Sequence, residues 1–272
     1  MTRHDKFNTL HAKAIHSRLV FDLRLHPASL SEQDLESLRF FGVTGALLVA
    51  DSSPSPTADA LLEHFETLTT VQLRRFEKAG FETRIALGIH PLSVPARGLH
   101  RVLDALPSFF SSGRVVALGL LGLARGGPLE EEAFDAQLQL ARRLKLPVIA
   151  SAPLLKRETM TKQLLTRLRE SKLPAERVVV DGANAKTVRL ILGRGHVAGL
   201  TLHPDQLTVE KAVPLIRALG AERVVLNTAA GDGAGDLLAL PRAANRLTQS
   251  GLTRSVVSRV AGQNARAFLG LK

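Results

Sequence analysis

The stretch Arg114–Ser151, RVVALGLLGLARGGPLEEEAFDAQLQLARRLKLPVIAS, decides the fold. Val115–Ala124 is an apolar run without polar alternation, which is typical of a strand buried on both faces of a parallel sheet. Its 10 residues are too few to span a bilayer, which takes about 20. Leu146–Ala150 repeats the apolar pattern. Two such strands with a helix between them form a βαβ unit.

The segment Glu130–Lys145 predicts that helix. Apolar residues recur at helical spacing, acidic residues fill the first turn, and basic residues fill the last turn. This charge order matches the helix dipole.

The same alternation continues along the whole chain. Strands are predicted at Leu19–Leu25, Val43–Ala50, Arg84–Ile89, Val115–Leu121, Pro147–Ala150, Arg177–Asp181, His196–Leu202 and Arg223–Thr228. Helices are predicted at Glu32–Phe41, Ala58–Ala79, Leu99–Phe110, Glu130–Lys145, Lys156–Ser171, Lys186–Leu192, Val209–Leu219, Leu237–Thr248 and Arg254–Phe268. Eight strand–helix repeats predict an α/β fold, a (β/α)8 TIM barrel. A doubly wound open sheet is the alternative, but Phe21–Pro27 (FDLRLHP) lacks the glycine-rich dinucleotide fingerprint.

Length and composition favour one intracellular domain. The 272 residues, 45% of them hydrophobic, suffice for a single barrel, 1–272, with an N-terminal extension at 1–17 and a closing helix at 254–272. No cysteine is present, so disulfides and thiolate metal sites are excluded. The N-terminus has no apolar segment of the secretory type, and we expect a cytoplasmic protein without a membrane span.

The net charge of +11 has two interpretations. It could attract an acidic protein or nucleic acid, or the charges could simply be solvated. Two basic stretches, Lys156–Lys172 and Leu237–Lys272, would lie on the outer helices and could form such a surface. The chain has no Trp or Tyr, so only Phe and Arg could stack on bases.

Polar side chains follow the predicted strands, where the active sites of such barrels lie. The candidate pocket at the barrel mouth comprises Asp22, Arg24, His26, His90, Asp181, His203 and Asp232. His26 could be a metal ligand or could bond to Asp22 or Asp181. His203 and Asp205 could be paired ligands, or Asp205 could cap the next helix.

These strand ends resemble the TatD-like metal-dependent hydrolases of the amidohydrolase superfamily. Members carry D-x-H-x-H, G-x-H-P, G-E-x-G-L, F-x-x-Q-L-x-L-A and N-A-x-x-F-L-G, in that order. The corresponding segments here are Asp22–His26, Gly88–Pro91, Gly119–Leu123, Phe134–Ala141 and Asn264–Gly270. The resemblance covers essentially the whole chain.

The resemblance implies ligands for one or two divalent metals, and this sequence departs from most of them. His26 matches, but Arg24 replaces the first histidine and Leu120 the bridging glutamate. Ser151 stands where the fifth strand should supply a histidine. The sixth-strand histidine would fall at Asp181 or Gly182. The eighth-strand aspartate would fall near Ala229–Gly231, and the nearest carboxylate is Asp232. An arginine guanidinium cannot coordinate a metal.

We therefore expect a pseudoenzyme without a cofactor, a TatD-like barrel that acts by binding, regulation or assembly. One alternative is an active hydrolase or nuclease with a rearranged Zn, Mn or Mg site, acting on phosphodiester, ester or amide bonds. A second is a non-catalytic nucleic-acid binder. Arg24 should pair with Asp22 or Asp181, since a buried charge is costly without a partner. Arg24 with His26 and His90 should leave the mouth electropositive, suited to a small anion.

Overall fold

Parallel strands form the centre of the protein. The computed structural model describes residues 20–50, 52, 56–152 and 156–271. Within these residues an 8-stranded sheet runs in the order β1 to β8, with parallel pairing from β1–β2 through β7–β8. The strands are β1 (Val20–Leu25), β2 (Val43–Val49), β3 (Glu82–Leu87), β4 (Val115–Gly122), β5 (Val148–Ser151), β6 (Val178–Asp181), β7 (Val197–Thr201) and β8 (Val224–Asn227).

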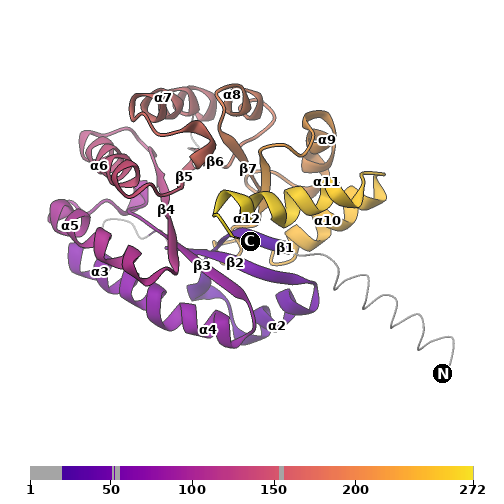
Figure 1. Ribbon diagram of the computed structural model, residues 1–272, viewed down its shortest axis with the longest axis horizontal. Coiled ribbons are helices and arrows are strands. Elements are labelled where there is room, and N and C mark those ends of the chain that lie inside the picture. Colours follow the sequence, from indigo (N-terminus) through magenta and orange to yellow (C-terminus); the bar gives the residue numbers. More distant parts are fainter. Residues whose placement is uncertain (1–19, 51, 53–55, 153–155, 272) are drawn as a thin grey trace.

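The sheet closes on itself between β1 and the chain that follows β8. Leu25 forms a parallel bridge with Ala230, and the N–H of His26 donates to the Ala230 carbonyl at 2.8 Å. The predicted (β/α)8 barrel is confirmed (Figure 1). The alternative of an open sheet is wrong.

Helices surround the barrel in the predicted places (Figure 1). They are α2 (Glu32–Phe40), α3 (Ala58–Thr67), α4 (Leu73–Lys78), α5 (Leu99–Phe109), α6 (Pro128–Leu144), α7 (Arg157–Glu170), α8 (Val188–Gly193), α9 (Val209–Leu219), α10 (Ala239–Gln249), α11 (Arg254–Ser258) and α12 (Asn264–Phe268). Across the described residues, no helix has the length and apolar character needed to cross a membrane.

Some helix boundaries differ from prediction for local reasons. The predicted helix at 186–192 begins two residues later as α8, because the Asn184 side chain accepts the N–H groups of Lys186 and Thr187 in a turn. A π-helical turn at Leu68–Gln72 joins α3 to α4, and another at Arg259–Gln263 joins α11 to α12. Each predicted helix there is thus one continuous helical segment with an inserted residue.

Apolar side chains fill the barrel interior as well as the layer under the helices. The interior cluster includes Phe21, Leu23 and Leu120 from strands, and Ala265 and Leu269 from the C-terminal helix. Asn264 anchors that helix by donating from Nδ2 to the carbonyls of Ala221 and Val224 at 2.6 and 2.8 Å. Because these carbonyls lie at the start of β8, the helix closes the barrel base. The mouth lies at the opposite end. The expected extension at 1–17 lies outside the described residues.

Candidate functional site

Arg24 lies at the centre of the side-chain contacts in the barrel mouth. It lies on β1, its side chain is buried, and its guanidinium contacts three side chains. Nη1 lies 3.2 Å from Asp181 Oδ2, Nη2 lies 3.4 Å from Asp232 Oδ2, and Nε donates to His26 Nε2 at 3.1 Å. The predicted pairing of Arg24 with Asp181 is therefore seen, and Asp232 is a second carboxylate that sequence reasoning did not assign to it.

Asp22 accepts hydrogen bonds from the backbone and from a threonine, and among the described residues no hydrogen bond or ion pair joins it to the Arg24 guanidinium. Its Oδ1 accepts the N–H groups of Arg24 and Thr228 at 3.0 and 3.2 Å, and its Oδ2 accepts the Thr228 hydroxyl at 2.6 Å. Burial raises the pKa of Asp22 from 3.8 to about 6, because desolvation outweighs these hydrogen bonds, and the charge of Asp181 adds to the rise.

Asp181 is fixed from two further strands. Its Oδ1 accepts the Thr201 hydroxyl at 3.0 Å and Asn227 Nδ2 at 2.7 Å. Gly199 on β7 makes room for it, since a Cβ there would lie 2.4 Å from Asp181 Oδ1. Thr201, Asn227 and Thr228 were not among the candidate pocket residues. Their common signal is a position at the end of β7 or β8.

The histidines of the mouth are uncharged acceptors or turn formers. His26 accepts from a guanidinium, so its Nε2 carries no proton. Burial, together with the positive charge of Arg24, lowers the pKa of His90 to about 3. His90 lies just beyond β3, where its Nδ1 accepts the Leu92 N–H at 3.2 Å. The glutamine of the F-x-x-Q segment holds this loop, since Gln137 Oε1 accepts the Ile89 N–H at 2.7 Å.

His203 holds two loops at the mouth. Its Nδ1 accepts the Asp205 N–H at 3.2 Å, and its Nε2 lies 3.2 Å from the Asp232 carbonyl oxygen. The N-cap of α9 is Thr208, so the interpretation of Asp205 as the cap is wrong. The turn formed by His203 and Asp205 places the start of the helix three residues later.

These contacts correct the expected electropositive mouth. The charge of Arg24 is balanced by two carboxylates, and His26 and His90 are neutral for the reasons given above. A cation that sequence reasoning missed is Arg157 at the start of α7. It is half-buried close enough to feel the charge of Asp181, and burial lowers its pKa. Within the described chain its side chain has no hydrogen bond or ion pair.

The positions that the motif resemblance assigned to metal ligands have other structural roles. Leu120 is buried in the apolar barrel interior. Ser151 ends β5 and is paired in register with Gly122 and Asp181. Gly182 and Gly231 have φ of +74° and +90°, and a Cβ on Gly231 would lie 2.0 Å from the His26 carbonyl oxygen. A side chain is strained at either glycine and blocked at Gly231.

The donor set at the mouth does not fit a divalent metal. The guanidinium of Arg24 engages His26, Asp181 and Asp232, the side chains with metal-binding atoms nearest to it. Among residues 20–50, 52, 56–152 and 156–271, no three His, Asp or Glu side chains are grouped to hold an ion. A fixed positive charge in their midst repels a cation.

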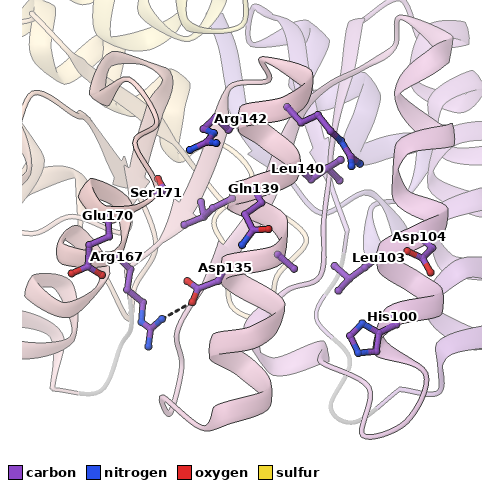
Figure 2. A pocket seen from close by; sticks show the side chains of 13 residues that line it. His100, Leu103, Asp104, Asp135, Gln139, Leu140, Arg142, Arg167, Glu170 and Ser171 are labelled. Carbon is purple, nitrogen blue, oxygen red and sulfur yellow. Dashed lines mark hydrogen bonds and ion pairs between the residues drawn. The ribbon is translucent and has the colours of Figure 1, made fainter.

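The outer basic stretches map to α7 and to α10–α12. In the first, Arg167 is engaged with acids of α6, at 2.7 Å from Asp135 Oδ2 and 2.6 Å from Glu131 Oε2. Arg167 and Asp135 line a pocket of about 950 Å³ between α5, α6 and α7, where acidic and basic side chains mix. Figure 2 shows these side chains. The expected acidic or nucleic-acid partner remains a prediction.

The closed parallel barrel, with histidines and aspartates gathered at its mouth, has the architecture of the TIM-barrel hydrolases. The family described as TatD related DNase matches residues 21–230, and the chain belongs to this family. The resemblance inferred from the sequence motifs is thus confirmed.

Individual relatives agree with this assignment. An uncharacterized metal-dependent hydrolase of Methanocaldococcus jannaschii is 29% identical over 254 residues, covering 93% of this chain and all of the relative. The crystal structure of a TatD-like protein from Archaeoglobus fulgidus has a TM-score of 0.77 at 27% identity, covering 92% of this chain and 100% of that one. The phosphotriesterase homology protein of Escherichia coli, complexed with phosphate, shares the fold at 16% identity and a TM-score of 0.68, over 93% and 99% of the two chains.

Proposed function

We propose that this TatD-family barrel has lost metal-dependent hydrolysis and acts in the cytoplasm by binding a ligand at its mouth. The observation that carries the proposal is the buried guanidinium of Arg24, which engages the buried His26 and Asp181 and the half-exposed Asp232. The protein's own cation takes the acceptors that a metal would need. Catalytic metal sites take three protein ligands and an open position, which this arrangement does not leave.

Metal content of the purified protein tests this proposal. After loading with zinc, manganese or magnesium and removal of free ions, we expect far less than one ion per chain. Arg24→His combined with Leu120→Glu should raise binding, while Arg24→His combined with Leu120→Gln, of matched shape, should do so less. Wild-type protein that holds near one ion per chain, lost in His26→Ala, would overturn the proposal.

A small anion such as phosphate or a carboxylate is the proposed ligand. Asp232 is half-exposed and its contact with Arg24 is long, at 3.4 Å, so an anion could take its place. Arg157 offers a second guanidinium near Asp181. Inorganic phosphate titrated by calorimetry should bind more tightly to Asp232→Asn and more weakly to Arg157→Gln. Arg143→Gln, an equal charge change on the outer end of α6, is the control. Equal affinities in all four proteins would exclude the mouth as the binding place.

An active hydrolase with a rearranged site is the second candidate. It is favoured by the relative described as a metal-dependent hydrolase and by Asp22, whose pKa near 6 suits proton transfer near neutral pH. Phosphodiesters, nucleic-acid ends and simple esters, with each metal added, are the substrates to assay. Turnover that disappears in Asp181→Asn or His203→Gln would establish this candidate in place of the binding function.

A further inference from the structure

An exposed aromatic pair lies far from the mouth, at the end of α2. Phe40 is 74% exposed, and its ring meets that of Phe41 edge-to-face at 5.2 Å between centroids. Beside it, a groove of about 790 Å³ runs between α2 and the helical segment of the π-helical turn and α4, with exposed Val71 in its lining. Large apolar side chains grouped in this way mark interaction surfaces.

The two walls of this groove differ in charge. The α2 wall presents two acids, Glu32 and Glu36, with Arg39 at its end turned onto the Phe81 ring, and the α4 wall presents Arg74, Arg75 and Lys78. Glu32 is already paired with Arg75, at 2.5 Å. Within the described residues, Glu36, Arg74 and Lys78 have no ion-pair partner.

Contacts across the groove show which residues of α2 lie beside which residues of α4. Near the start of α2, Glu32 is paired with Arg75 of α4. Near its end, the Arg39 guanidinium lies 5.6 Å from the Phe81 ring centroid and close to Gly80, just after α4. Glu36, between Glu32 and Arg39, is therefore level with the end of α4.

We propose that this groove binds the same groove of a second copy of the chain. The copy is turned about a two-fold axis along the groove, so that α2 of each copy lies opposite α4 of the other. Glu36 then faces Lys78 of the partner copy, and Phe40 covers the partner's turn at Ala79 and Gly80. One patch supplies both halves of each contact, as a two-fold interface requires.

Charge and size argue for this occupant and for a weak dimer. A nucleic acid would place phosphates against Glu32 and Glu36, whereas a second copy places cations there. Long-range repulsion from the net charge of +11 is screened at physiological salt, where the Debye length is about 8 Å. Two helices side by side offer roughly 500 Å² per copy, below the ~800 Å² of a standard interface. Dimerisation should therefore depend on concentration.

Sedimentation velocity from micromolar to several hundred micromolar protein tests the proposal. We expect a monomer–dimer equilibrium that Glu36→Lys or Lys78→Glu weakens at least about tenfold, while the double variant Glu36→Lys/Lys78→Glu restores it. Phe40→Ser should weaken it as well, and thermal melting will verify that its fold is intact. Glu170→Lys and Lys162→Glu on α7 are matched charge reversals that should change nothing.

Three outcomes would overturn the proposal. They are a monomer at every concentration, a double variant as weak as the single variants, and a dimer unaffected by positions 36, 40 and 78. Binding of a labelled single-stranded DNA by a protein that stays monomeric, lost in Lys78→Glu and kept in Lys162→Glu, would assign the groove to a nucleic acid instead. None of these measurements depends on the ligand of the mouth.

Discussion

Arg24 and Arg167 each hold two carboxylates, but one does so inside the barrel mouth and the other on the outer helices. The Arg24 side chain is 7% exposed and contacts Asp181 and Asp232. The Arg167 side chain is 28% exposed and joins α7 to α6 through Asp135, as Figure 2 shows, and through Glu131.

The difference in burial changes what each cluster contributes. Exposed ion pairs are screened by solvent and stabilise a protein by about 1 kcal/mol or less. A buried charge must instead recover a desolvation penalty, so loss of one partner leaves a costly unpaired group. The mouth cluster therefore fixes one arrangement of β1, β6 and the loop after β8, whereas the outer cluster is replaceable. The following changes test this contrast.

The largest effect should follow from Asp181→Ala. It removes the buried carboxylate closest to the Arg24 guanidinium, so we expect a loss of about 3–5 kcal/mol in the free energy of unfolding. Asp135→Ala, its counterpart on the outer face, should lose no more than about 1 kcal/mol. Denaturant titration measures both, and equal losses would show that burial does not distinguish the clusters.

Asp22→Asn should remove a pH dependence of stability. The folded-state pKa of about 6 exceeds the ordinary 3.8, so the folded state holds its proton longer and stability falls as pH rises from about 4 to 6. This difference in pKa corresponds to a fall of about 3 kcal/mol in the free energy of unfolding. Asn keeps an acceptor for the two N–H groups and adds a donor toward Thr228. The free energy of unfolding of the variant, measured relative to wild type, should therefore rise across this window and then level off.

A control with the opposite sign is available on α2. Hydrogen bonds from Ser31 lower the pKa of the exposed Asp34, which therefore stabilises the protein above its ordinary pKa and loses this effect as pH falls. In urea titrations from pH 3 to 7, Asp34→Asn should lose stability relative to wild type as pH rises. If the free energies of unfolding of the two variants changed with pH in the same way, the raised pKa of Asp22 would be contradicted.

Gly199→Ala should disturb the mouth cluster without removing a charge. Its new Cβ would lie 2.4 Å from Asp181 Oδ1, so the carboxylate must move away from Arg24 or β7 must shift. We expect a loss of about 2 kcal/mol. Gly193→Ala, at the end of α8 where a Cβ meets nothing within 4 Å, is the control and should be neutral or slightly stabilising. Similar melting temperatures for the two variants would speak against a tightly packed Asp181.

The smallest effect should come from Arg167→Ala. Loss of two exposed ion pairs should cost less than about 1 kcal/mol, and the cost should shrink further in 1 M salt, where the Debye length is about 3 Å. Urea titrations at low and high salt measure this. A cost that persists unchanged in salt would mean that Arg167 acts through packing of its aliphatic stem.

Sequence reasoning reached the barrel because its evidence is local. Continuous apolar runs such as Val115–Gly122 and the amphipathic pattern of α6 each carry their own signal. The pairing of Arg24 with Asp181 was also predictable, because a charge at a buried strand end requires a partner. The contact between Arg24 and Asp232 was harder to predict, because it depends on how the loop after β8 folds back over β1.

The charge state of the mouth was not predictable from residue types. Whether His26 and His90 carry a proton depends on the guanidinium of Arg24 and on burial, and neither appears in a strand-end pattern. Arg157 lies at the start of α7, whereas the pocket residues were predicted from the ends of the strands. Thr228 was not among the predicted pocket residues, although its hydroxyl donates to Asp22, because the strand pattern does not show which side chains meet across the mouth.

The closure of the barrel has a consequence for the speed of folding. Leu25 pairs with Ala230, and Phe21 shares its interior cluster with Ala265 and Leu269, so the contacts that complete the core join opposite ends of the described chain. Such contacts must recover the entropy of a very long loop, which gives slow folding in proteins with a high contact order. Until β1 meets the chain beyond β8, the sheet has two bare edges that could pair with other chains. Aggregation during refolding should therefore respond more to substitutions at this seam than to equally buried substitutions between β4 and β5.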